Sequence, residues 1–141
     1  MSTEEIVVDS SVVIALVTPE SASERVSRKL ADYDYFHILD LNYYEVANGI
    51  GVKVVRKELT KKEGIEAFTN AVKVMDLYAI HNFSEIIANA IAISLETGIT
   101  SYDGAFIALA REIDAKLLTL DAKLAAKLRG TKYYKFVEEL S

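Results

Sequence analysis

The chain has 141 residues, 51% of them hydrophobic and 26% charged, which fits one globular domain, 1–141, built around one core. It has no cysteine and only two histidines, which excludes disulfides and thiolate zinc sites and disfavours a histidine-rich metal centre. The formal net charge of −5 disfavours a nonspecific nucleic-acid binder, although a carboxylate cluster that binds metal would itself add negative charge.

In the first half of the chain, two short apolar runs predict buried strands, and each is followed by helical patterns. Acidic residues stand where a signal peptide would be positive, and no apolar run is long enough to span a bilayer, so we expect a cytoplasmic protein. Thr18-Pro19 is expected to restart helical structure, with a capping box over 21–24. The predicted elements are strands over 6–8 and 35–39 and helices over 12–17, from 18 onward, 41–57 and 60–75.

The second half of the chain continues this alternation without a linker or a repeat, so no internal boundary is expected. The predicted strands cover 77–80, 116–120 and 133–137, and the helices cover 84–97, 101–113 and 121–128. Short strands alternating with helices predict a three-layer α/β/α, Rossmann-like fold with a parallel sheet of about five strands. Ligands of such sheets bind beyond the carboxyl ends of the strands, and acidic residues fall there.

Three aspartates lie at these strand ends or helix starts, and each also has an ordinary structural explanation. Asp9 and Asp121 follow strands, where a helix N-cap is as good an interpretation as a metal ligand. Asp103 lies in the first turn of a predicted helix, where the helix dipole favours a carboxylate. Ser10 and Ser11 are placed to cap the first helix instead, which would free Asp9 for a metal.

Glu45 is harder to explain as a structural residue. On the helix predicted over 41–57, Glu45 lies within a mainly apolar stripe. The stripe consists of Leu41, Tyr44, Asn48, Val52 and Val55. A carboxylate in the centre of an apolar stripe must be paired, protonated or bound to a cation. Asp103 repeats the pattern, because its helix face also carries Phe106, Ile107 and Ala110.

Clustered carboxylates without histidine or cysteine are hard oxygen ligands that suit Mg²⁺ or Mn²⁺ rather than zinc. A metal held in this way can activate water and neutralise charge on a phosphoryl group. The pattern therefore indicates phosphate chemistry without saying which phosphate. The last acidic residue is flanked by candidates for contact with a substrate backbone, namely Lys123, Lys127, Arg129 and Lys132.

Four stretches resemble the acidic motifs of PIN-domain ribonucleases, in particular of the VapC-type toxins of toxin–antitoxin pairs: IVVDSSVVIAL, YYEVANGI, TSYDGAFIALA and LLTLDAKLAAKL. The resemblance runs from residue 6 to about residue 136. The family's acidic metal-binding and catalytic positions carry over onto Asp9, Glu45, Asp103 and Asp121. Ser11 and Thr119 match hydroxyl positions that support the cluster. Gly104 stands where many relatives carry alanine, a departure expected to matter little.

The resemblance implies a PIN fold, dependence on Mg²⁺ or Mn²⁺, and endonucleolytic hydrolysis of RNA by water that the metal activates. In this scheme Ser11 and Thr119 orient carboxylates by hydrogen bonds. It also implies a homodimer and inhibition by a cognate antitoxin protein. The target RNA and the antitoxin class are not implied.

Two other functions stay open. A Mg²⁺-dependent phosphotransfer domain also uses an aspartate at a strand end, but the dehalogenase-like kind needs a second aspartate where this chain has Ser11, and Glu45 has no role in it. A catalytically silent PIN-like scaffold that binds a protein partner is the non-enzymatic alternative. Neither His37 nor His81 has a partner in the sequence that completes a metal site, so packed or solvated roles are expected.

The predicted helix over 41–57 is apolar on a second stripe as well, formed by Tyr43, Ala47, Ile50 and Val54. A helix that is apolar nearly all round is buried on more than one side. We expect this stripe to meet a second subunit in a symmetric dimer. The alternative is that the helix over 60–75 covers it within one chain.

Overall fold

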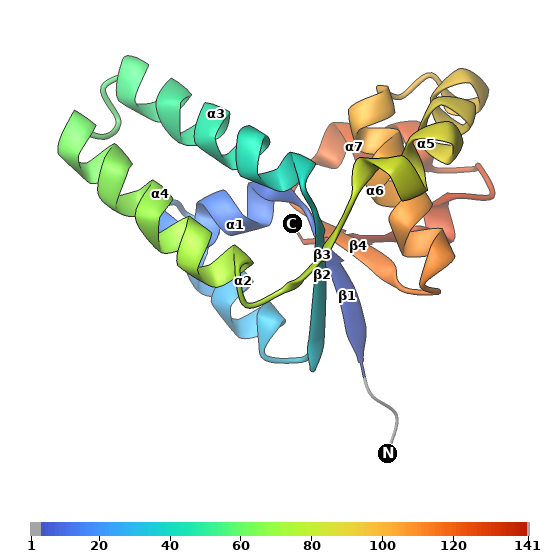
Figure 1. Ribbon diagram of the computed structural model, residues 1–141, viewed down its shortest axis with the longest axis horizontal. Helices are drawn as coiled ribbons and strands as arrows, with labels where there is room; N and C mark the ends of the chain where they lie inside the picture. The colour runs from blue at the N-terminus through green and yellow to red at the C-terminus, as the bar shows by residue number, and fades with distance from the viewer. Residues whose placement is uncertain (1–3, 141) are drawn as a thin grey trace.

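The chain folds into a five-stranded parallel sheet with helices on both faces, as Figure 1 shows. The computed structural model describes residues 4–140. The strand order is β3-β2-β1-β4-β5, and every neighbouring pair is parallel. The strands are β1 (Glu5–Val8), β2 (Tyr35–Leu39), β3 (Ala79–His81), β4 (Lys116–Thr119) and β5 (Val137–Glu139). The predicted α/β class and its parallel sheet are confirmed.

The helices divide into two groups, one on each face of the sheet (Figure 1). One face carries α1 (Ser10–Val17), α2 (Ser23–Leu30), α3 (Leu41–Val55) and α4 (Lys61–Met75), and the other carries α5 (Phe83–Thr97), α6 (Ser101–Glu112) and α7 (Ala122–Leu128). Successive side chains of β1 alternate between the faces, so Ile6 and Val8 join the first core and Val7 joins the second. No helix within residues 4–140 is long and apolar enough to cross a membrane.

Helix starts follow the capping signals at several predicted positions. The Asp40 carboxylate accepts a hydrogen bond of 2.9 Å from the backbone N–H of Leu41 and begins α3. Thr60 and Glu63 form the reciprocal capping box of α4, with bonds of 3.1 and 2.8 Å. These local bonds satisfy N–H groups that a helix leaves unpaired, so local sequence was sufficient to place both helix starts.

Three predicted elements are wrong in detail. Helix α2 begins only at Ser23, with Ala22 as its N-cap and no capping hydrogen bond from a side chain, so the capping box expected over 21–24 does not form. The strand predicted over 77–80 is β3, which begins two residues later and covers Ala79–His81. The strand predicted over 133–137 starts with a 3₁₀ turn over Tyr134–Phe136, and β5 begins at Val137. A spacing of three residues places Tyr133 and Phe136 on one side of that turn, where both are buried.

Most of the second apolar stripe of α3 packs against α4 within the chain. Ile50 is buried in the core that α3 and α4 share, and the Tyr43 hydroxyl donates a 2.7 Å hydrogen bond to Asp76 at the end of α4. A Cβ at Gly64 of α4 would lie 2.6 Å from a methyl of Val54, so glycine permits this close approach. Ala47 stays exposed, but the rest of the stripe is covered by α4, as the single-chain alternative has it, so the stripe gives little support to a second subunit at this face.

Gly104 matters more than its position in the motif suggested. A Cβ at this residue would lie 2.6 Å from the backbone carbonyl oxygen of Ala90, because α5 and α6 pack against each other at this point. Alanine would therefore push α5 away from α6. The expectation that glycine here is inconsequential is wrong.

Candidate active site

The four acidic residues singled out in the sequence all lie at the carboxyl edge of the sheet. Asp9 directly follows β1, and Asp121 comes two residues after the end of the neighbouring β4. Glu45 lies on α3 and Asp103 in the first turn of α6. Their charges interact, because Asp9, Glu45 and Asp103 each have a pKa that neighbouring carboxylates of this group help to raise.

Asp9 accepts three hydrogen bonds. Its Oδ1 accepts from the Ser10 backbone N–H at 2.8 Å, and its Oδ2 accepts from the hydroxyls of Ser11 at 2.8 Å and Thr119 at 2.6 Å. Burial nevertheless raises the pKa of Asp9, and the charge of Asp121 adds to this effect. The expectation that the serines cap α1 is wrong, since Asp9 is itself the N-cap. The Ser11 hydroxyl instead connects Asp9 with the Leu120 N–H, which donates to it at 3.2 Å.

The carboxyl group of Glu45 titrates near neutral pH. Burial raises its pKa to about 7, with smaller contributions from the charges of Asp9 and Asp103. The Ser10 hydroxyl donates a 2.8 Å bond to Glu45 Oε1 and acts in the opposite direction. The helix stripe around Glu45 does not cause this burial, because Tyr44 is 79% exposed. The prediction of an inward carboxylate holds in the structure, but the reason is the position of Glu45 at the end of the sheet.

Ser10 and Asn42 belong to this site and were not predicted as site residues. Asn42 is fully buried in the first turn of α3. Its Nδ2 donates at 3.1 Å both to the Val8 carbonyl oxygen and to the Ser10 hydroxyl, while its Oδ1 accepts from the Leu39 N–H at 2.8 Å. A polar residue three positions before Glu45, and therefore on its helix face, was the available signal in the sequence.

Asp103 and Asp121 differ in their local partners. Burial raises the pKa of Asp103, followed by the charges of Asp9 and Asp121, while Thr100 and Lys127 lower it. Asp121 Oδ1 accepts from the backbone N–H groups of Lys123 at 3.0 Å and Leu124. Asp121 therefore caps α7, as the ordinary interpretation allowed, and these capping bonds use only one of its two carboxylate oxygens.

The chain is similar to known proteins over most of its length. The PIN domain family model matches residues 6–128. Ribonuclease VapC3 of Pyrobaculum aerophilum is 37% identical over 123 residues, which cover 87% of this chain and 94% of that protein. The chain belongs to the VapC group of PIN-domain proteins. The resemblance seen in the four acidic stretches is therefore confirmed.

Solved structures share the fold of this VapC-group chain at low sequence identity. A toxin–antitoxin complex from Klebsiella pneumoniae matches with a TM-score of 0.67 and 17% identity, covering 96% of this chain and 99% of that one. VapC20 of Mycobacterium tuberculosis, described as a sarcin–ricin loop cleaving toxin, matches with a TM-score of 0.64 and 15% identity, covering 86% and 93%. At these identities the likeness shows the fold alone.

The acidic cluster of this PIN domain lacks an ion-pair partner in the described part of the chain. Within residues 4–140, no lysine or arginine forms an ion pair with Asp9, Glu45, Asp103 or Asp121. In that range no group of three or more His, Asp or Glu side chains is arranged so that it could hold a metal ion as the side chains stand. A cation bound by these carboxylates would draw them together and offset the repulsion among their negative charges.

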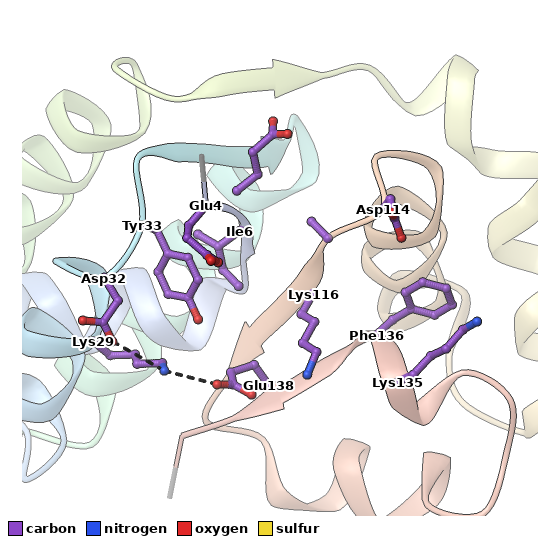
Figure 2. A pocket seen from close by; sticks show the side chains of 12 residues that line it. Glu4, Ile6, Lys29, Asp32, Tyr33, Asp114, Lys116, Lys135, Phe136 and Glu138 are labelled. Atoms are coloured by element: carbon purple, nitrogen blue, oxygen red, sulfur yellow. Dashed lines mark ion pairs between the residues drawn. The ribbon is translucent and has the colours of Figure 1, made fainter. Parts of the chain in front are cut away.

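Two hollows flank the sheet at opposite edges. One hollow of about 600 Å³ adjoins the acidic cluster. Its lining includes Phe83 and two tyrosines that directly precede acidic residues of the cluster, Tyr44 before Glu45 and Tyr102 before Asp103. The other, of about 660 Å³, lies where β1 and β4 begin, as Figure 2 shows. There Lys29 pairs with Glu138 at 3.2 Å and with Asp32 at 3.6 Å, and most of the charged residues that line this hollow are acidic. None of the predicted site residues lines this second hollow.

Proposed function

We propose that this PIN domain is a Mg²⁺- or Mn²⁺-dependent endoribonuclease and the toxin of a toxin–antitoxin pair, acting in the cytoplasm. The group of half-buried carboxylates without a basic partner carries the proposal. Oxygen ligands of this kind suit Mg²⁺ and Mn²⁺, and such ions serve phosphate chemistry. The name of VapC3 as a ribonuclease supports RNA as the substrate.

Each polar residue of the site has a role in this scheme. The residues that hold the ion are Asp9, Glu45, Asp103 and Asp121. When bound, the ion neutralises charge on the phosphate and makes a water molecule more acidic. Ser11 and Thr119 both donate hydrogen bonds to one oxygen of Asp9. They therefore hold its carboxylate in one orientation toward the ion. Asn42 and Ser10 do the same for Glu45 through consecutive hydrogen bonds.

Lys123 and Lys127 of α7 are the basic residues best placed to contact the RNA backbone. Lys127 lies near enough to Asp103 to lower its pKa, which places its charge beside the acidic cluster. The other two predicted contacts have partners elsewhere, since Lys132 pairs with Glu96 at 3.2 Å and Arg129 with Glu139 at 4.0 Å. Among the four predicted phosphate contacts, the structure therefore favours Lys123 and Lys127.

The competing functions fit the site less well. A dehalogenase-like phosphotransfer domain needs a carboxylate where Ser11 stands, and here the Ser11 hydroxyl donates to Asp9. Such a domain also has no use for Glu45 in the cluster. A silent scaffold gives no reason to retain several carboxylates whose mutual repulsion is unfavourable in the metal-free protein.

RNA cleavage tests the proposal. The purified protein should cut a mixed RNA substrate with Mn²⁺ and stop when a chelator is added, and Asp103→Asn should reduce the rate more than about 100-fold. Glu66→Gln, which changes an exposed carboxylate of α4, should cut at the wild-type rate. Cleavage that continues in chelator, or survives in Asp103→Asn, would contradict the proposal.

A protein antitoxin is the expected partner, in keeping with the Klebsiella complex that shares the fold. We also propose a homodimer, through a different surface from the one the sequence suggested. Exposed apolar side chains recur every four residues along α5, at Phe83, Ile87, Ile91 and Leu95. Tyr44 and Tyr102 extend this surface toward the acidic cluster. A continuous apolar stripe of this kind is best covered by the same stripe of a second copy related by a two-fold axis.

Light scattering after size exclusion measures this assembly. At micromolar concentration the protein should be a dimer, and Ile87→Asp should weaken the dimer by at least about 30-fold, because a charge would enter an apolar interface. Leu77→Asp introduces the same charge at an exposed apolar residue before β3, at the opposite end of that strand from α5, and should remain dimeric. A wild-type monomer at this concentration would refute the dimer.

A further inference from the structure

Two histidines that stand far apart in the sequence form a contact across the sheet. His37 of β2 and His81 of β3 face the α5–α6 side, since they lie in register with Val7 and Leu39 of that core. His37 Nδ1 and His81 Nε2 are 3.0 Å apart. Packed or solvated roles were expected for both histidines, and the sequence did not indicate that they contact each other.

A carboxylate faces the outer nitrogen of each ring. Glu5 Oε1 of β1 lies 2.8 Å from His37 Nε2, and Glu85 Oε2 in the first turn of α5 lies 3.9 Å from His81 Nδ1. The first contact is a hydrogen bond, whereas the second is too long for one. Glu5 therefore favours a hydrogen on the outer nitrogen of His37, and Glu85 lies on the outer side of His81.

One hydrogen is enough to join the two rings. In neutral imidazoles, His81 Nε2–H can donate to His37 Nδ1 while His37 Nε2–H donates to Glu5, which leaves the outer nitrogen of His81 as an acceptor that faces Glu85. A cation in place of the shared hydrogen would accept both inner lone pairs, and both outer nitrogens would then carry hydrogen toward the carboxylates.

We propose that His37 Nδ1 and His81 Nε2 bind one first-row transition-metal ion, zinc in the first instance, with water in its remaining positions. Imidazole nitrogen suits zinc, copper and nickel. Two imidazoles on one tetrahedral zinc, each bonded at about 2.0–2.1 Å, hold their nitrogens roughly 3.3 Å apart. The observed 3.0 Å needs an opening of a few tenths of an ångström. Carboxylates on the outer nitrogens are the usual support of metal-binding histidines, and Glu5 and Glu85 supply them.

The site is distinct from the carboxylate cluster in place and in chemistry. Its ligands come from within strands β2 and β3 rather than from the segments that follow β1 and β4, and they are nitrogen rather than oxygen. The side chains of His37 and His81 are 12% and 22% exposed, which leaves solvent access for water ligands. A bound ion would link the three-residue edge strand β3 to β2, so it would stabilise the edge of the sheet that leads into α5.

Copper and zinc added to tag-free protein test this site. One equivalent of Cu²⁺ should give an electron paramagnetic resonance spectrum with coupling to two imidazole nitrogens. Zinc at about a hundredfold excess over its Kd should raise the Tm by roughly 5–10 °C. Both effects should vanish in His37→Gln and in His81→Gln and persist in Asp103→Asn, which impairs the carboxylate cluster instead.

Three results would overturn the proposal: copper bound by oxygen ligands alone, no zinc-dependent rise in Tm, or an equal rise in the histidine variants. If a histidine variant does not fold, a variant that keeps both histidine ligands still tests the site. Glu5→Gln should weaken zinc binding about 10-fold, because it weakens the hydrogen bond that orients His37. Unchanged zinc affinity in Glu5→Gln would likewise count against the site.

Discussion

Replacing Glu45 by glutamine should abolish RNA cleavage while leaving the protein folded. The variant keeps the size of the side chain and its ability to accept the Ser10 hydrogen bond, but it removes one negative metal ligand. We expect the cleavage rate with Mn²⁺ to fall more than about 100-fold, since even residues that only support a ligand are worth 10- to 100-fold. The test is the cleavage rate of the variant per folded molecule, with circular dichroism as the check on folding.

The same variant should be more stable than wild type above neutral pH when no metal is present. The pKa of Glu45 is raised from 4.5 to about 7 in the folded protein. Between these values the folded state holds a proton that the unfolded state has lost, so the free energy of unfolding falls as pH rises through this window. Burial of Asp9 and Asp103 acts in the same direction. Glu45→Gln should flatten this pH dependence.

Glu66→Gln is the matched control for both measurements, because Glu66 is an exposed carboxylate on α4. It should leave the cleavage rate and the pH dependence of unfolding unchanged. A Glu45→Gln protein that unfolds, yet cuts normally per folded molecule, would show that Glu45 is a structural residue rather than a ligand.

Asn42→Ala should destabilise the protein more than substitution of any of the four acidic residues. It leaves the Leu39 N–H without its acceptor and the Val8 carbonyl and Ser10 hydroxyl without their donor, all at a fully buried position. Leaving buried polar groups unpaired costs about 1–3 kcal/mol each, so with three such groups we expect the free energy of unfolding to fall by at least about 3 kcal/mol. Urea unfolding without metal measures it.

Asn48→Ala is the matched control, since Asn48 is an exposed asparagine on the same helix. It should change the free energy of unfolding by no more than about 0.5 kcal/mol. If the two variants were equally stable, the buried hydrogen bonds of Asn42 would not be what holds α3 at the end of the sheet.

Local chemistry made much of the fold predictable. The apolar runs of β1, β2 and β4 are buried on both faces, so their sequences carry a continuous signal that survives without knowledge of the fold. The capping box at Thr60 and Glu63 depends on residues three apart, and it placed the start of α4 correctly. The 3₁₀ turn before β5 could not be predicted in this way, because it depends on the core that receives Tyr133 and Phe136.

The acidic residues could be placed at one edge because parallel strands end together, but their partners could not. Which of Ser10 and Ser11 meets Asp9 and which meets Glu45 depends on how α1 sits against α3. The contact between His37 and His81 depends on the register of β2 with β3, and nothing local in the sequence encodes it. The apolar stripes of α3 were assigned to the wrong surroundings for the same reason. A stripe shows that a face is apolar, not which helix covers it.

Calorimetric measurement of Mg²⁺ binding tests the central claim, which is that the four carboxylates form a divalent metal site. Magnesium is the suitable ion because it prefers oxygen ligands and does not compete for the imidazole nitrogens of the histidine pair. The wild-type protein should bind it at millimolar concentration or below, and Asp9→Asn and Asp103→Asn should weaken binding at least about 10-fold, with Glu66→Gln unchanged. Absence of binding at millimolar Mg²⁺, or equal binding by wild type and both aspartate variants, would contradict the account.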